Sequence, residues 1–217
     1  MRLGIYAIMT DELSPRVFAA FQRFIHEETG IDLSENKKTL FISRLAKRLR
    51  ALGLRDFDDY WEKCQDSTFF SHERTEIIND ITTNTTSFFR ESDHFSSLKG
   101  YLVGTAGKAK SRERVFRIWS SACSTGQEAY SIAMVAQDAL KDHPGWDFKI
   151  LASDIDTNVL EFASRGVYEN DQVKEVPHEF RGRYFLRVEN GKNEFQITDN
   201  IRKKIIFRQI NMLSDPL

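Results

Sequence analysis

The segment from Val115 to Tyr168 constrains the fold of this chain more than any other. "VFRIW" (115–119) has the apolar character of a buried strand, "SSACSTG" (120–126) is a loop of small residues, and "QEAYSIAMVAQDAL" (127–140) has helical spacing of its apolar residues. A second strand, "FKILASD" (148–154), and a second helix, "TNVLEFASRGVY" (157–168), follow. This strand, loop, helix, strand and helix order predicts a parallel α/β domain.

The N-terminal part of the chain has a different pattern. Residues 14 to about 80 are predicted to be all-helical, because apolar residues recur at helical spacing between start and stop signals. Ser14 followed by Pro15 is a helix start, and Gly30 and Gly53 are helix stops. We therefore expect a small helical domain at 1–80.

The segments that follow complete the predicted organisation. Residues 81–114 are expected to form a loop and linker, in which a helix gives way to a basic, glycine-bearing connection within 98–114. Residues 115–217 are expected to form the α/β domain. Within it, "RYFLRVENGKNEFQITD" predicts a hairpin at about 182–200 with Asn190-Gly191 at its turn. "KIIFRQINML" predicts one more strand.

Composition excludes several classes of protein. The formal net charge of −1 gives no general attraction to nucleic acid or membranes. No apolar run approaches the roughly 18 residues of a membrane-spanning helix, and the acidic "TDE" after the first residues argues against a secretory signal. Cys64 and Cys123 are far apart and no histidine lies at ligand spacing, so we expect no metal site and no disulfide framework. These features predict a reduced, cytoplasmic protein without direct membrane insertion.

The small-residue loop at 120–126 indicates a nucleotide or cofactor site, because backbone can approach a ligand closely there. The dinucleotide signature G-x-G-x-x-G and the phosphate-binding signature G-x-x-x-x-G-K-[ST] are both absent from the sequence. Glu128 lies just inside the following helix, either as a ligand-binding carboxylate or in a capping box with Thr125. Cys123 is interpreted as a compact apolar residue, since no activating base accompanies it.

Polar residues also end the next two strands. Asp154 can accept hydrogen bonds from both hydroxyls of a ribose, although it or Asp156 could instead cap a helix. Asn211 is predicted to end the last strand, where its amide could contact an adenine edge. Together with Glu128, these residues describe an adenosine-type ligand lying across strand ends.

The stretch "ITTNTTSFFR" (81–90) has too many β-branched residues for a good helix and no regular alternation for a strand. It is predicted to be a polar loop fixed at one end by Phe88 and Phe89. Two interpretations stay open at this point. It is either a rigid loop that carries function, or a connection between helices whose Thr and Asn residues serve as caps.

Three stretches resemble the chemotaxis receptor methyltransferases of the CheR type: "TTNTTSFFRE", "WSSACSTGQEAYSIAM" and "ASDIDTNVLEFASRGVY". The resemblance implies a small N-terminal all-helical domain and a class I S-adenosylmethionine-dependent methyltransferase domain, Rossmann-like, with an inserted antiparallel β-subdomain. It implies methyl transfer from S-adenosylmethionine to glutamate side chains of chemoreceptors, with S-adenosylhomocysteine as product. It also implies that the 81–90 loop closes over the cofactor.

The same resemblance implies the roles of individual residues. Arg90 would lie near the methionine carboxylate and the reaction centre, as the catalytic residue. Asp154 would bind the ribose, Glu128 the methionine end, and Asn211 with Met212 the adenine side. The full set implied to contact the cofactor is Asn84, Thr86, Arg90, Glu128, Asp154, Asn211 and Met212.

A basic stretch suggests how a partner binds. From Lys37 to Arg55 there are seven basic residues and no acidic ones. The simpler interpretation is a solvated helix face. A second is docking of acidic receptor helices, which the resemblance also implies, whereas nucleic acid fits less well because no aromatic residues interleave with the basic ones. The predicted docking residues are Lys37, Arg44, Lys47 and Arg48.

The chain also departs from the family, whose members continue past the position of Leu217 into a strand with an Arg-Asn pair and a Tyr. We therefore expect a fragment with an incomplete sheet, in which "VFRIW" is an open edge that favours strand-exchanged self-association. Two alternatives to a chemotaxis methyltransferase stay open. One is a non-catalytic module that binds cofactor or receptor, and the other is a methyltransferase of the same fold with another substrate.

Overall fold

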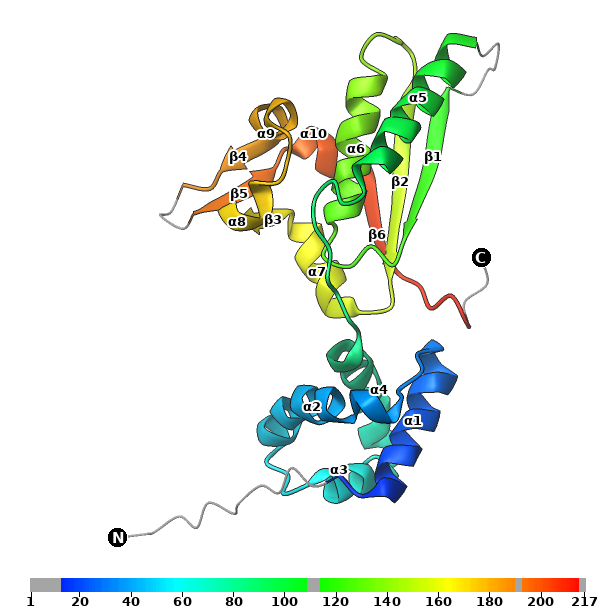
Figure 1. The fold of residues 1–217 in the computed structure, drawn as a ribbon, viewed down its shortest axis with the longest axis vertical. Coiled ribbons are helices and arrows are strands. Elements are labelled where there is room, and N and C mark those ends of the chain that lie inside the picture. The colour runs from blue at the N-terminus through cyan, green and yellow to red at the C-terminus, as the bar shows by residue number, and fades with distance from the viewer. Residues whose placement is uncertain (1–12, 109–113, 190–192, 215–217) are drawn as a thin grey trace. The chain divides into compact units, whose positions relative to one another are not determined.

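The computed structural model describes residues 13–108, 114–189 and 193–214. Within these ranges the chain forms two compact units (Figure 1). Of the described residues, 13–83 and 211–214 form a helical unit, and those within 84–210 form an α/β unit. The division falls just before Asn84, whereas the sequence suggested a helical domain at 1–80 and a separate linker at 81–114.

The helical unit begins as its sequence predicts. Ser14 caps the first helix, with its side chain accepting from the Val17 amide at 3.3 Å, and Pro15 takes the first helical position. Gly30 and Gly53 end helices in left-handed conformations, with φ of 71° and 66°. The elements are α1 (Pro15–Thr29), the 3-10 helix η1 (Glu35–Lys37), α2 (Lys38–Leu52), α3 (Phe57–Lys63) and α4 (Ser67–Ile81).

Aromatic side chains form the core of this unit. The Phe21 ring packs against Phe41 and against Trp61, with centroid distances of 5.1 Å and 4.7 Å, and Phe57 and Tyr60 are fully buried. Such ring pairs contribute to stability beyond the area that they bury.

The α/β unit holds two three-stranded sheets. The larger sheet has the order β1-β2-β6 and all its pairs are parallel, which confirms the predicted parallel α/β fold. The smaller sheet is antiparallel and has the order β3-β5-β4. The elements are α5 (Ser92–Lys108), β1 (Val115–Ser121), α6 (Gln127–Ala139), β2 (Asp147–Asp154), α7 (Thr157–Arg165), β3 (Val167–Glu169), α8 (Asn170–Val173), α9 (His178–Tyr184), β4 (Phe185–Arg187), β5 (Glu194–Ile197), α10 (Asp199–Arg202) and β6 (Ile205–Gln209).

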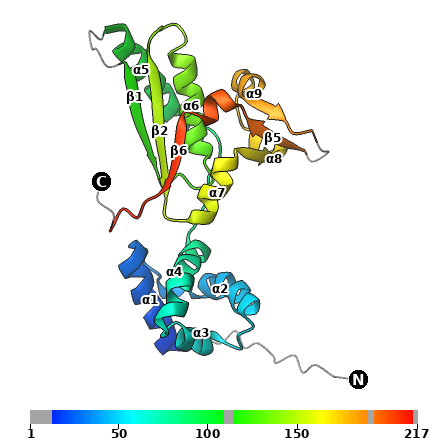
Figure 2. The ribbon, with the colours of Figure 1, turned by 180° about the vertical axis from the view of Figure 1, so that it is seen from behind.

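One face of the parallel sheet is covered by α5 and α6, which run side by side along it in Figure 1. Figure 2 shows the sheet from behind, with β1, β2 and β6 in front. Trp119, Leu151 and Ile206 are in register across the three strands, at positions that alternate with the residues covered by α5 and α6. Trp119 is 42% exposed. Among the described strands β1 and β6 are the edges of this sheet, so "VFRIW" is an edge strand as predicted. Self-association through it stays a prediction.

Three local predictions differ from the structure. The 98–114 segment, predicted to become a connection, stays helical to Lys108, because Leu102 is buried and α5 packs along α6 despite its glycines. The second helix ends at Arg165 and not at Tyr168, since Gly166 turns the chain at φ 62° into β3. Strand β3 is part of the small sheet, which therefore begins before residue 182. The Asn190-Gly191 turn lies outside the described residues.

Candidate functional site

The candidate site is built where β1 and β2 end, at the same edge of the parallel sheet. Glu128 lies in the first turn of α6, and its carboxylate accepts a hydrogen bond from Ser120 Oγ of β1 at 2.7 Å. An acidic side chain in the first turn of a helix is stabilised by the helix dipole. The side chain is exposed, so this carboxylate can meet a cationic ligand at the end of β1.

Asp154 ends β2 and is only 7% exposed. One of its oxygens accepts from the Ser124 amide at 2.7 Å and the other accepts from the Asp156 amide at 3.0 Å. A carboxylate offers about four acceptor positions, so these two bonds leave capacity for ribose hydroxyls. The carboxylate thus ties the loop after β1 to the loop after β2 and can still bind a ligand.

Backbone strain is concentrated in two stretches beside the predicted site residues, around Phe89 and in the loop after β1. Among described non-glycine residues, positive φ occurs at Phe89 (53°), Glu91 (58°), Ala122 (53°) and Ser124 (50°). Such conformations cost of order 1–3 kcal/mol each, and they persist where surrounding contacts enforce them, commonly at functional sites.

Tyr168 of β3 helps to hold the loop after β1 in place through a hydrogen bond. Its hydroxyl donates to the Thr125 carbonyl at 2.6 Å, and burial raises its pKa well above the usual value. Gly126 has φ 91°, and a Cβ there would lie 2.8 Å from Ala163 Cβ and 3.1 Å from the Tyr168 hydroxyl. Only glycine therefore fits between this loop and α7.

The "ITTNTTSFFR" stretch forms an ordered loop after α4, because contacts fix both of its ends. At one end Asn84 Nδ2 donates to Asp156 Oδ2 at 2.7 Å, and Ser124 Oγ donates to the Asn84 carbonyl at 2.8 Å. At the other end Phe88 and Phe89 pack on aromatic rings of the same unit. Phe88 is 2% exposed and contacts Tyr168 and Phe185, while Phe89 contacts Phe95 and Phe180. The prediction that these phenylalanines fix the loop is confirmed.

The predicted catalytic residue lies next to these anchors. Arg90 is exposed, and its guanidinium donates to the Thr85 carbonyl at 3.3 Å, which is a weak bond. Thr86 is half-buried between the two anchored ends. A cation on a fixed backbone with an exposed head group can bind a carboxylate.

The structure decides between the alternatives that the sequence left open. No capping box forms at α6, since Gly126 occupies the N-cap and Thr125 Oγ1 bonds to Gln127 Oε1 at 2.7 Å. Asp156, and not Asp154, caps α7. Burial, and next to it the Asp154 charge, raise the pKa of Cys123 to about 12, so its thiol stays protonated and is no nucleophile.

Asn211 and Met212, predicted to contact adenine, belong to the helical unit in the structure. The last strand ends at Gln209, two residues before Asn211. Asn211 Nδ2 donates to the Glu28 carbonyl at 2.6 Å, and Met212 is 56% exposed. Their adenine contact stays a prediction.

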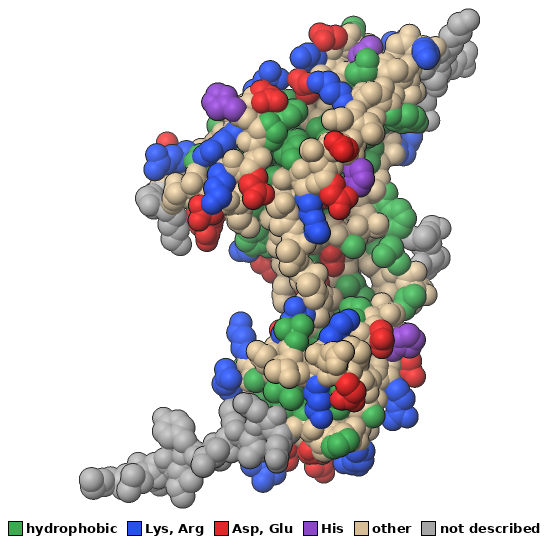
Figure 3. Space-filling view, viewed as in Figure 1, with side chains coloured by type: hydrophobic (Ala, Val, Ile, Leu, Met, Phe, Trp, Pro, Cys, Tyr) green, Lys and Arg blue, Asp and Glu red, His purple; other side chains and the backbone are tan. Residues whose placement is uncertain are grey.

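The four predicted docking cations are not equivalent. Arg48 forms a bidentate pair with buried Glu73, and Arg44 donates to the carbonyls of Ile81 and Thr82 at the end of α4. Lys37 and Lys47 are exposed. Figure 3 shows basic side chains along the edge of the helical unit where Figure 1 draws α2.

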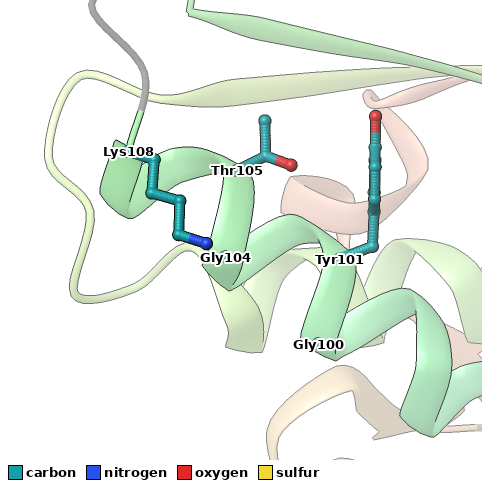
Figure 4. Close-up of a pocket in the computed structure, with 5 residues that line it drawn as sticks. All are labelled: Gly100, Tyr101, Gly104, Thr105 and Lys108. Atoms are coloured by element: carbon teal, nitrogen blue, oxygen red, sulfur yellow. The ribbon is translucent and has the colours of Figure 1, made fainter.

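A recess also lies on α5, lined by Gly100, Tyr101, Gly104, Thr105 and Lys108. Figure 4 shows Tyr101 and Thr105 projecting from the same side of this helix. The lining contains no carboxylate and no residue of the strand-end loops, so this recess is separate from the candidate site.

The strand-end residues fit S-adenosylmethionine. The Glu128 carboxylate suits a cationic group, the remaining acceptor positions of Asp154 suit a ribose diol, and the exposed Arg90 guanidinium suits a carboxylate. In the described part of the chain, no cluster of three or more His, Cys, Asp or Glu residues could hold a metal ion. Within the same residues, no helix combines the length and apolarity needed to cross a bilayer.

Sequence reasoning missed Ser120 and Tyr168 as supports of the site. Both lie in the quoted stretches. Ser120 is a buried residue of β1 between two exposed neighbours, and its hydroxyl donates to Glu128 in α6. The signal for Tyr168 was Gly166, a helix stop two residues earlier that should have placed "VY" in a strand.

Residues 84–217 match the family model described as "CheR methyltransferase, SAM binding domain", and residues 16–82 match "CheR methyltransferase, all-alpha domain". A probable chemotaxis protein methyltransferase of Rhizobium etli is 38% identical over 88% of this chain and 71% of its own length. The chemotaxis protein methyltransferase of Escherichia coli is 38% identical over 93% of this chain and 68% of its own length. That of Borreliella burgdorferi is 34% identical over 96% and 72%.

Proposed function

Because this chain belongs to the CheR methyltransferase family and carries its S-adenosylmethionine-binding domain, we propose that it methylates glutamate side chains of chemoreceptors. It is an S-adenosylmethionine-dependent methyltransferase, and the alternative of a non-catalytic binding module is not favoured. The single observation that supports the substrate is the similarity to relatives such as the Escherichia coli chemotaxis protein methyltransferase. The product is a glutamate methyl ester.

In this proposal the strand-end residues hold the cofactor. Asp154 accepts from the ribose, and Glu128 binds the methionine end. Arg90 binds the methionine carboxylate and orients the substrate glutamate. Asn84 and Thr86 complete the contacts of the 84–90 segment, and the adenine contact of Asn211 with Met212 stays a prediction. When bound, S-adenosylmethionine supplies an electrophilic methyl group that passes to a glutamate oxygen and leaves S-adenosylhomocysteine.

The residues of the chain have little proton chemistry to perform. A glutamate side chain has a pKa of about 4.3 and is already ionised at neutral pH, so it needs no general base. The task is alignment of the carboxylate and removal of its water. Arg90 is suited to this task because its guanidinium is exposed and its bond to the Thr85 carbonyl, at 3.3 Å, is weak, so it can turn toward a carboxylate. A group that held the nucleophile too tightly would slow the attack on the methyl group.

The partner in this proposal is the cytoplasmic domain of a transmembrane chemoreceptor, which places the enzyme in the cytoplasm. Lys37 and Lys47 are suited to contact acidic helices, since both are exposed. A recess of about 310 Å³ beside Lys37 is lined mainly by apolar residues, including half-exposed Leu40. It offers space for an apolar side chain of the partner.

Two measurements test the proposal. Calorimetry with S-adenosylhomocysteine should show one site, and Asp154→Ala should weaken binding by about 1.5–3 kcal/mol through loss of a charge-assisted contact. Asp171→Ala, an exposed carboxylate of the same unit, is the matched control. Tritiated methyl groups should appear in base-labile esters when the protein is mixed with receptor-containing membranes. No binding by the wild-type chain, or label elsewhere than on glutamate, would overturn the proposal.

A further inference from the structure

Asp156 is a buried carboxylate with two separate tasks. Only 2% of the residue is exposed. Its Oδ1 accepts from the amides of Asn158 and Val159 at 2.8 Å and 3.3 Å and so caps α7. Its Oδ2 accepts from Asn84 Nδ2 at 2.7 Å, from a residue 72 positions earlier in the chain. The second bond is not needed for the cap.

The Asn84 bond belongs to a closed ring of hydrogen bonds. Ser124 Oγ donates to the Asn84 carbonyl, and the Ser124 amide donates to Asp154. The Asp156 amide also donates to Asp154, and the Asp156 side chain accepts from Asn84, which closes the ring. The ring joins the 84–90 segment to the loop after β1, which leads into α6 and Glu128, and to the end of β2, where Asp154 lies.

Asp156 fixes one end of the 84–90 segment, and Phe88 and Phe89 fix the other. Thr86 and Arg90 therefore have their positions set by these anchors. We propose that Asp156 is a positioning residue, which acts through Asn84 to hold this segment in its cofactor-binding form without touching the cofactor. The inference rests on the proposed function and adds a residue to its machinery.

The polarity of the Asn84–Asp156 bond makes the proposal testable. A carboxylate can only accept, whereas an amide can donate from one side and accept on the other. In Asp156→Asn the new amide oxygen can still cap α7, while the new NH2 group points toward Asn84. The Asn84 side-chain amide can turn over so that its oxygen accepts from this NH2 group. In Asn84→Asp two carboxylates face each other in a buried position, and the bond is replaced by repulsion. Combining the two substitutions restores the bond with reversed polarity.

The experiment measures S-adenosylhomocysteine affinity, the KM for S-adenosylmethionine and kcat in these three variants of the full chain. Asn84→Asp should weaken affinity about tenfold or more and raise the KM, from the loss of a bond to a charged group. Asp156→Asn should lose less affinity than Asn84→Asp. The double variant should regain the part of the affinity that depends on the bond between positions 84 and 156. Asp171→Asn on the exposed surface is the control. Urea unfolding of each variant shows whether affinity is lost because the α7 cap is destabilised, or because the 84–90 segment is displaced while stability is unchanged.

Two results would overturn the inference. If the double variant binds no better than Asn84→Asp, the whole loss comes from the cofactor contact of Asn84 itself, and Asp156 does not act through Asn84. If Asp156→Asn loses as much affinity as Asn84→Asp at equal stability, the carboxylate itself is the ligand. Failure of the wild-type chain to bind S-adenosylhomocysteine would instead count against the proposed function, so the two failures are distinguishable.

Discussion

Removing the Arg48 guanidinium should destabilise the helical unit. Glu73 is only 3% exposed, and it accepts from Arg48 Nε at 2.9 Å, from Arg48 Nη2 at 2.5 Å and from the Tyr60 hydroxyl at 2.9 Å. Removing one partner of a buried ion pair costs about 3–5 kcal/mol, because the other charge is left buried alone. The Arg48 side chain is 25% exposed and water can replace part of the contact, so we expect Arg48→Ala to cost about 2–4 kcal/mol.

Urea unfolding of the full chain would measure this loss. Hydrogen exchange resolved by peptide would show whether protection falls in α2 and α4, the helices that the pair joins. Arg50→Ala removes an exposed cation from the same helix and is the matched control. Glu73→Gln in combination with Arg48→Ala should recover part of the loss, because no buried charge is then left without its partner.

The pH dependence follows from the same pair. Burial raises the pKa of Glu73, but the hydrogen bonds from Arg48 and Tyr60 outweigh it and the net pKa is lowered. A lowered folded pKa gives stability that is present above the unfolded pKa and lost as pH falls through the folded one. The difference between wild type and Arg48→Ala should therefore shrink on acidification. Equal urea midpoints for Arg48→Ala and Arg50→Ala at neutral pH would refute this reasoning.

Four further perturbations test other parts of the structure. Gly126→Ala should destabilise the α/β unit by about 1–3 kcal/mol and weaken S-adenosylhomocysteine binding, since a Cβ clashes there at φ 91°; urea unfolding and calorimetry measure both effects. Asp138, whose pKa three neighbouring cations lower to about 2, should contribute about 1–2 kcal/mol at neutral pH after screening of its half-exposed partners. The urea-midpoint difference between wild type and Asp138→Asn should thus persist above pH 4 and vanish as pH falls through 2. Trp119→Lys on the β1 edge should reduce any concentration-dependent association seen by light scattering, and an unchanged mass profile would argue against edge pairing. Lys47→Glu should weaken receptor binding in pull-down assays and leave S-adenosylhomocysteine affinity and stability unchanged, and the effect should fall with salt; undiminished receptor binding would leave α2 a solvated face.

Local rules allowed the sequence to predict much of the fold. Ser14, Gly30 and Gly53 mark helix ends through contacts within a few residues, so the structure confirms them. The strand, loop and helix pattern after Val115 likewise predicts a parallel sheet, because parallel strands need a crossover helix between them. The carboxyl ends of such strands meet at one edge, which is why Glu128 and Asp154 could be assigned to one site from sequence alone.

These local rules could not predict which residues far apart in the sequence form hydrogen bonds with one another. The sequence shows a run of cations in α2, but only packing against α4 reveals that Arg48 is paired with Glu73, 25 residues later. It shows one aspartate at the end of β2 and another two residues later, but only the fold assigns Asp156 to the α7 cap and to Asn84. Caps and periodicity act over a few residues, whereas these hydrogen bonds form only after the core has brought distant segments together. The sequence thus determined the kinds of element and the chemistry of the strand ends, and the tertiary structure decided which polar side chains remain available to a ligand.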